Sequence, residues 1–220
     1  MNAVGPNLTI TGVDGTAPYT FTYNINGGAP LSVNTAAGES TVSITASTAA
    51  AGTFDYNLTQ VQDANASACG AANSTTTVDV NDLPTATINA ATPGVCKDAN
   101  EPDVTFTGAN GTPPYTFTYN INGGGNLTAT TAAGTSSVNV QAPTGTAGTY
   151  TYNLVSVQDA SATACTNPAA GNTVITIFPA PGATITGGAT YCKNGAATDI
   201  ILTGNLGNAP YTFTYDIDGG

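Results

Sequence analysis

The sequence predicts an all-β protein built of tandem sandwiches, with essentially no helix. Three observations support this prediction. Residues that favour strands, namely Thr, Val, Ile, Tyr and Phe, are abundant. Apolar and polar residues alternate with a period of two over short segments. One long stretch of the chain also repeats at a fixed interval, whereas a sustained period of 3.6 residues, which a helix would need, is found nowhere in it.

The repeat is marked by a segment that occurs three times. The sequence PYTFTYNINGG at residues 18–28 returns unchanged at residues 114–124, and returns at residues 210–220 with Asp216 and Asp218 in place of two asparagines. The interval is 96 residues each time. A repeat of this length is a whole domain, since the repeats of solenoid proteins run to about 20–45 residues.

Junctions that contain proline divide the chain into three units. They lie at residues 81–84 and 178–181, where proline stiffens the connection and prevents one strand from running into the next. Residues 1–82 form a unit that lacks its first strand, residues 83–179 a complete unit, and residues 180–220 a partial unit with only the first strands. We therefore expect the chain to be part of a longer array.

Period-two alternation predicts the strands of the complete unit in order. They lie at residues 85–89, 103–107, 115–121, 137–141, from 149 onward, and 173–178. Glycine-rich clusters at residues 108–111 and 123–125 supply turns between them. About seven short strands in roughly 100 residues are typical of an immunoglobulin-like sandwich.

Aromatic residues of the repeated segment alternate with threonine, so they lie on one face of a strand. This pattern predicts that they form the core. The alternative is an exposed platform on which sugars stack, built around Tyr19, Tyr115 and Tyr211. The predicted core residues are Tyr19, Phe21, Tyr23, Phe106, Tyr115, Phe117, Tyr119 and Tyr152.

Charge excludes several classes of partner. The chain has two cations, Lys97 and Lys193, against 13 acidic residues, and its formal net charge is −11. Such a surface repels nucleic acids and anionic membranes. No apolar run approaches the roughly 18 residues of a membrane span, so we expect no membrane insertion. The N-terminus lacks the basic and apolar regions of a secretion signal, and export would be directed by sequence elsewhere.

Catalytic and metal-binding patterns are scarce. The sequence has no His, so it holds neither a Ser-His-Asp nor a Cys-His arrangement, and we expect no enzyme activity, no cofactor and no metal. Asp98, Glu101 and Asp103 form the densest carboxylate cluster, a weak calcium candidate that we interpret as a solvated loop. Asn81 and Asp82 beside Pro84 form a weaker candidate for calcium in a linker.

Four motifs recur in the units and carry a family resemblance. They are TFTG at residues 105–108, PYTFTY at 114–119, AGTY at 147–150 and VQDA at 157–160. Together they resemble the immunoglobulin-like or PKD-like tandem repeats of very large surface proteins from Bacteroidota, including gliding-motility adhesins exported by the type IX system. The resemblance covers the whole chain, and it implies a location on the bacterial cell surface and a role as stalk or adhesin.

Tyr150 also looks like the tyrosine at the start of strand F in immunoglobulin domains, whose hydroxyl binds back to the backbone. The first unit has Phe54 at this position, which lacks the hydroxyl. Two residues later, Tyr56 and Tyr152 stand where an antibody domain has its second cysteine. The usual disulfide between the sheets is therefore absent, and we expect aromatic packing to fill the space.

Cysteines in a chain of this kind suggest disulfide bonds. Pairing of Cys96 with Cys165 within the complete unit is the first possibility. These residues fall in connections that face opposite ends of an immunoglobulin topology, so a bond from Cys96 to the second cysteine of the following unit is the other. Cys69 and Cys192 have no partner within the chain under either scheme, and we expect their partners to lie outside it.

Three functions fit these features. The first is a structural spacer that holds a distal binding domain of an extracellular adhesin away from the cell, with neighbouring repeats as its partners. The second is a subunit of a polymeric fibre that self-associates, because a strand from another molecule could complete the unit that lacks one. The third, a glycan-binding module, needs exposed aromatic residues.

Overall fold

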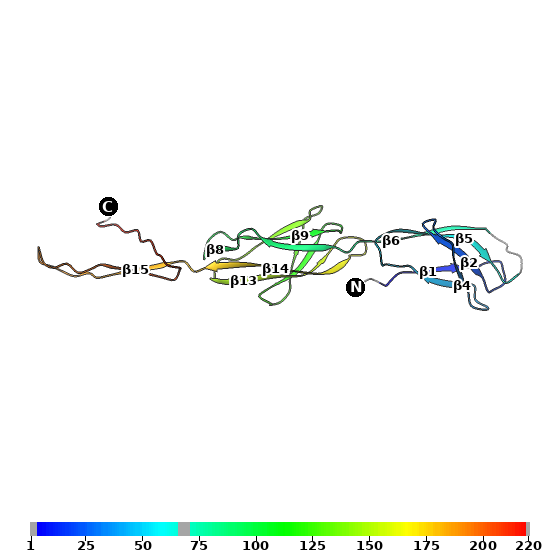
Figure 1. The fold of residues 1–220 in the computed structure, drawn as a ribbon, viewed down its shortest axis with the longest axis horizontal. Coiled ribbons are helices and arrows are strands. Elements are labelled where there is room, and N and C mark those ends of the chain that lie inside the picture. Colours follow the sequence, from blue (N-terminus) through cyan, green and yellow to red (C-terminus); the bar gives the residue numbers. More distant parts are fainter. Residues whose placement is uncertain (1–3, 66–70, 219–220) are drawn as a thin grey trace. The chain divides into compact units, whose positions relative to one another are not determined.

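A computed structural model describes residues 4–65 and 71–218 (Figure 1). None of these residues is helical, and the strands confirm the predicted all-β class. In this part of the chain no apolar helix is long enough to cross a membrane. The chain divides into two compact units, Met1–Leu83 and Pro84–Gly220.

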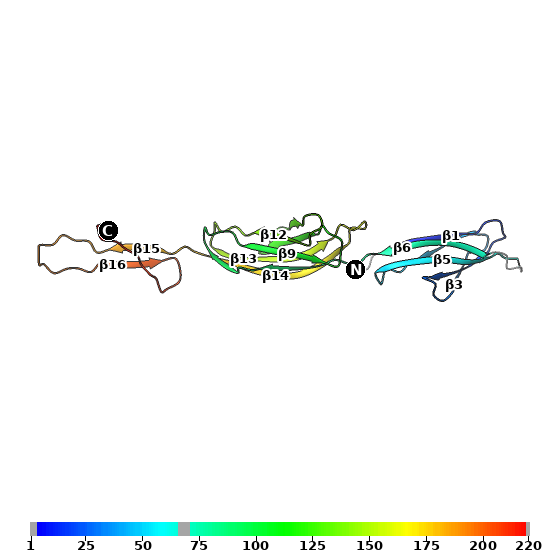
Figure 2. The same ribbon diagram turned by 90° about the horizontal axis from the view of Figure 1, so that it is seen from above.

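The second unit contains a β-sandwich of eight strands in two sheets, which can be followed in Figures 1 and 2. One sheet has the order β12-β9-β7 and the other the order β11-β10-β13-β14-β8. The strands are β7 (Thr85–Ala90), β8 (Gly94–Cys96), β9 (Asp103–Ala109), β10 (Thr116–Ile121), β11 (Leu127–Thr130), β12 (Ser137–Gln141), β13 (Gly148–Gln158) and β14 (Thr166–Phe178).

Alternation along each strand divides its side chains between core and solvent. In β9, Val104 and Phe106 are fully buried between the sheets. Thr107 lies on the outer face, where its hydroxyl is 3.0 Å from that of Ser137 on β12. Such cross-strand pairs of short polar side chains cover the solvent face of a sheet with few charges.

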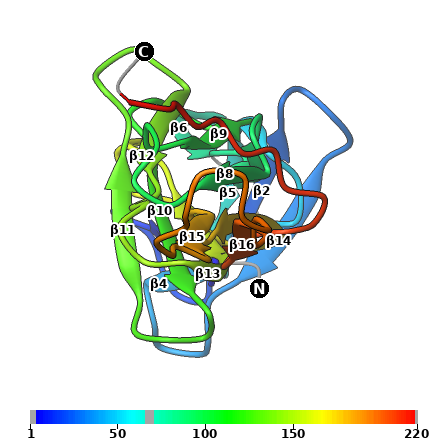
Figure 3. The ribbon, with the colours of Figure 1, turned by 90° about the vertical axis from the view of Figure 1, so that its left-hand side faces the viewer.

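Two short strands were not predicted, and one long strand starts earlier than predicted. Strand β11 pairs antiparallel with β10 (Figure 3), and β8 pairs parallel with the end of β14. Strand β14 starts at Thr166 rather than at 173. Its first half contains Pro168 and Gly171, which predict an interruption, but Pro168 lies at an irregularity in the pairing with β13. Proline is tolerated at such bulges.

The first unit repeats this arrangement with two strands fewer, because its described residues include no counterpart of β7 or of β8. Sheet β1-β4 faces sheet β3-β2-β5-β6. The strands are β1 (Asn7–Thr11), β2 (Thr20–Ile25), β3 (Leu31–Asn34), β4 (Thr41–Thr45), β5 (Gly52–Gln62) and β6 (Ala71–Val80). Among its described residues no strand pairs with β1 other than β4, so the position that β7 occupies beside β9 has no counterpart here.

Strands β15 (Gly182–Thr186) and β16 (Ile201–Asn205) form a separate two-stranded antiparallel sheet near the end of the chain. Their register places Ile185 opposite Leu202, as Ile88 of β7 is placed opposite Phe106 of β9. Within the described part of the chain neither strand pairs with any other. This sheet therefore reproduces the start of a further repeat.

Candidate functional site

The aromatic residues of the repeated segment lie inside the units. Tyr19, Phe21, Tyr115 and Phe117 are buried, and Tyr23 is half-buried. The Tyr115 hydroxyl donates a hydrogen bond to the Gly111 carbonyl oxygen over 2.7 Å. With Tyr19 and Tyr115 covered by protein, their rings are closed to a sugar. The sugar-stacking alternative is therefore wrong for these two positions, while Tyr211 is half-buried.

A stack of rings fills the centre of the second unit. The ring centroids of Phe106 and Tyr119 are 4.8 Å apart, and those of Tyr119 and Tyr152 are 6.3 Å apart. Burial raises the pKa of both tyrosines above the ordinary value. Aromatic packing thus fills the interior around Tyr152, as expected from the sequence. The hydroxyl of Tyr152 stays protonated at neutral pH because burial raises its pKa.

Tyr150 anchors the start of β13. Its hydroxyl donates a hydrogen bond to the Thr146 carbonyl oxygen over 3.0 Å, four residues upstream in the loop. This is the contact that the likeness to strand F of immunoglobulin domains implied. Phe54 holds the same place in the first unit without a hydroxyl, so this contact contributes to the fold of one unit and is dispensable in the other.

A buried carboxylate that the sequence analysis missed ties two loops together. Asp159 Oδ2 accepts a hydrogen bond from the Thr112 amide over 3.0 Å, and Oδ1 accepts one from the Ser161 hydroxyl over 2.8 Å. Burial opposes ionisation of Asp159, but these hydrogen bonds outweigh it, and the pKa of its carboxyl lies below the ordinary value. Asp63 binds the Thr16 amide in the same way in the first unit. In the sequence, this role is indicated by the motif VQDA, which occurs in both units and contains Asp63 and Asp159.

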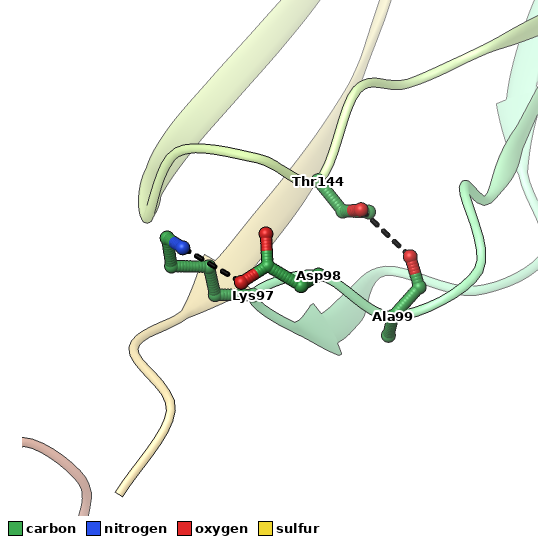
Figure 4. A network of polar contacts seen from close by, with 4 residues as sticks. All are labelled: Lys97, Asp98, Ala99 and Thr144. Carbon is green, nitrogen blue, oxygen red and sulfur yellow. Dashed lines mark hydrogen bonds and ion pairs between the residues drawn. The ribbon is translucent and has the colours of Figure 1, made fainter. Parts of the chain in front are cut away.

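The candidate calcium residues are not brought together. Asp98 Oδ2 forms an ion pair with Lys97 Nζ at 2.7 Å (Figure 4). Asp103 instead accepts a hydrogen bond from the Asn139 amide on β12, and Glu101 is exposed. Throughout residues 4–65 and 71–218 no three acidic, His or Cys side chains are grouped so that they could hold a metal ion. The predicted cluster is therefore not a site in this structure.

The loop that carries Asp98 is instead fixed by backbone contacts. The Thr144 hydroxyl donates a hydrogen bond to the Ala99 carbonyl oxygen over 2.6 Å (Figure 4). The Asp98 amide donates one to the Thr144 carbonyl oxygen, and the Lys97 amide one to that of Phe178. These contacts close one end of the sandwich.

The two cysteines of the eight-stranded sandwich, Cys96 and Cys165, lie at opposite ends of β14. Cys96 pairs with Phe178, the last residue of that strand, and Cys165 immediately precedes Thr166, its first residue. A strand of this length spans roughly 40 Å at about 3.3 Å per residue, whereas a disulfide joins Cα atoms about 4.4–6.8 Å apart. Both cysteines are free. The bond predicted within the unit is therefore wrong.

Bonds between units stay a prediction. Cys165 is close to the start of the unit, because the neighbouring Asn167 donates a hydrogen bond to the Pro84 carbonyl oxygen over 3.0 Å. Cys96 is close to its end, beside Phe178. Cys192 is an exposed free thiol, and Cys69 lies outside the described residues. The eight-stranded sandwich of the second unit thus has one cysteine at each end.

An open groove of about 450 Å³ runs along β1 in the first unit. Besides the residues of β1, it is lined by Tyr23, Ile44, Tyr56, Leu58, Ser74 and Thr76. These residues come from both sheets, so the groove leads from the surface toward the interior of the sandwich. It contains no cation and no nucleophile arranged with a base.

Comparisons with known proteins find weak similarity to several solved structures, among them the following two. One is a Ca²⁺-stabilized adhesin that helps an Antarctic bacterium reach out and bind ice, with 18% identity and a TM-score of 0.37 over 85% of this chain. The chain spans about half of that protein, 53% of its length. The other is the amphioxus IgVJ-C2 molecule, with 14% identity and a TM-score of 0.32 over 79% of this chain and 97% of that one. No protein-family model and no curated protein matches the chain.

Proposed function

We propose that this chain is a run of structural spacer repeats in an extracellular adhesin on a bacterial surface. The observation that carries the proposal is the 96-residue repeat of a folded unit whose interior is filled by its own side chains. In each unit, Tyr, Phe, Val and Ile side chains pack in the core. An Asp side chain joins two loops by hydrogen bonds. A spacer needs such units and needs no reactive group.

The composition of the surface supports an extracellular location. Exposed strand faces carry Thr, Ser and Asn side chains that bond to one another, as Thr105 does to Asn139. With two cations in the whole chain, few surface ion pairs are available, and solubility depends on these neutral groups and on the net charge of −11. The resemblance of the recurring motifs to repeats of Bacteroidota adhesins supports a protein of that type. We propose no catalytic role, because the chain has no His.

Deleting one repeat from the natural surface protein tests the spacer role. Residues 84–179 are removed so that the 96-residue phase is kept at the junction. We expect cells to retain ligand binding while the protein, labelled at its far end and seen by electron microscopy, reaches a shorter distance from the cell. Loss of binding in a variant whose remaining units fold would contradict the proposal, because the repeats would then carry the binding site.

A further inference from the structure

Strands β7 and β8, at the start of the eight-stranded sandwich, run in the same direction as its last strand, β14. At the start of β14, the Asn167 side-chain amide donates a hydrogen bond to the carbonyl oxygen of Pro84, which precedes β7. Midway, a Cβ placed on Gly171 of β14 would lie 3.4 Å from Ile88 Cγ2 of β7. At its far end β14 pairs in parallel with β8 (Figure 1). The chain therefore enters beside the start of β14 and reaches the end of β14 through β8.

This arrangement decides how tension passes through the sandwich. A pull on the chain from both sides acts at Pro84 and at Phe178, the last residue of β14. Strand β7 pairs with β9 in the other sheet, so its load reaches β14 only through the core. Strand β8 pairs with β14 itself, and the pull draws these two strands in opposite directions along their length. The evenly spaced bonds of such a parallel pair are sheared together, so they share the load.

The pairing of β8 with β14 is closed by a backbone hydrogen bond on each side. The Thr176 amide donates to the Pro93 carbonyl oxygen over 2.9 Å, and the Lys97 amide donates to that of Phe178 over 2.7 Å. The Phe178 ring also lies on the backbone of Gly94, because a Cβ placed there would be 2.8 Å from the ring. Backbone bonds and an apolar contact thus hold this short strand in place.

We propose that the contact between β8 and β14, closed by the Lys97 N–H, bears the load when the sandwich is stretched. It then sets how long the sandwich stays folded under tension, which is a question of unfolding rate. The inference rests on the proposed spacer role, because an array held between a cell and a bound ligand is under tension. It goes beyond that role, since a spacer could hold its units together without such a contact.

Lys97→Pro tests the outermost bond. The Ala99 amide donates to the Cys96 carbonyl oxygen over 3.1 Å, which closes a four-residue turn. Of its two central residues only Asp98 has a positive φ, 62°, as in a type II turn, where proline is favoured at the second position. The substitution should therefore keep the turn while it removes the N–H that reaches β14. Lys97→Ala is the matched control, since it loses the same side chain and its ion pair but keeps the N–H.

Optical tweezers that hold the whole chain at constant force measure how long each unit stays folded. The eight-stranded sandwich is recognised because residues 85–178 release more chain than residues 7–80 of the first unit. We expect its lifetime under force to fall about tenfold or more for Lys97→Pro, and to stay that of the parent chain for Lys97→Ala. Equal lifetimes of the two variants would overturn the proposal.

Unfolding in denaturant, without force, separates load bearing from ordinary stability. We expect Lys97→Pro to accelerate unfolding there by a smaller factor than under force. The same factor in both measurements would show that the bond only adds to stability, and the proposal would fail. Repeat deletion tests the spacer role separately: a shorter reach together with equal lifetimes of the Lys97 variants would keep that role and refute this contact.

Gly94→Ala tests the apolar side of the contact independently. The added Cβ meets the Phe178 ring, so the variant should also shorten the lifetime under force. Gly125→Ala is its control, because a Cβ there meets nothing within 4 Å. If Gly94→Ala and Lys97→Pro both stay folded under force as long as their controls, the load is borne elsewhere and the proposal is wrong.

Discussion

The ring of Tyr115 lies directly on the backbone of Gly108: a Cβ placed on this glycine would come within 2.5 Å of the ring. Gly12 and Tyr19 have the same relationship at 2.6 Å in the first unit. The glycine of the TFTG motif and the tyrosine of the PYTFTY motif are therefore two halves of one contact. Each repeat needs both.

Replacing this glycine should destabilise the second unit. Gly108→Ala forces the Tyr115 ring out of place, and we expect a loss of about 1–3 kcal/mol in the free energy of unfolding, as for other overpacked cores. Denaturant unfolding, monitored by tyrosine fluorescence, measures this loss in the free energy of unfolding. Gly125→Ala is the control, because a Cβ there meets nothing within 4 Å. Equal stability of the two variants would contradict the role of the contact.

The hydroxyl of Tyr150 should contribute a small, measurable amount. Its hydrogen bond to Thr146 is exposed, so Tyr150→Phe should reduce the stability of the second unit by about 0.5–1 kcal/mol. The first unit provides the reciprocal variant, Phe54→Tyr, which should leave the second unit unchanged. An unaltered unfolding midpoint for Tyr150→Phe would show that the bond contributes nothing.

Acid should weaken the loops that Asp159 joins. Its carboxyl pKa is lower in the folded protein than the ordinary value of about 3.9. Its contribution is therefore complete above that value and is lost as the pH falls through the folded pKa. Asp159→Asn should reduce the free energy of unfolding at neutral pH. Below a pH of about 4, the stability of this variant should fall less steeply than that of the parent chain, because it has no carboxylate to protonate at this position. Asp98→Asn, an exposed carboxylate paired with Lys97, is the control. An unchanged acid profile for Asp159→Asn would be evidence against this role.

Peptide mapping without reduction tests the positions of the cysteines. We expect no linked peptide that contains both Cys96 and Cys165, because β14 separates them. A thiol reagent should label the exposed Cys96 faster than the half-buried Cys165 in the folded protein, and at equal rates after denaturation. A Cys96–Cys165 peptide in quantity would show that the ends of β14 are not where the structure places them.

Much of this fold follows from local patterns in the sequence. The alternation of Phe117 and Tyr119 with threonine predicts both the strand and its buried face, because successive side chains of a strand point to opposite sides. The strands β8 and β11 have three and four residues, too few for a period to be recognised. Their existence depends on pairing with distant strands, which a local pattern does not contain.

The candidate sites were harder to predict for the same reason. The nearness of Asp98, Glu101 and Asp103 in sequence does not bring them together, because Asp103 points to Asn139 across the sheet. Cys96 and Cys165 could be placed in their connections, but the length of β14 that separates them was hidden by Pro168 and Gly171. The missing strand of the first unit was predictable from the repeat. The groove that it leaves depends on packing between sheets.

Expression of residues 84–179 alone tests most directly whether each repeat is an independent folded unit. We predict one cooperative unfolding transition, with amides of β9 and β13 strongly protected from hydrogen exchange in the isolated unit. A chain that is unfolded by itself, or that folds only when residues of the neighbouring repeats are present, would contradict the account.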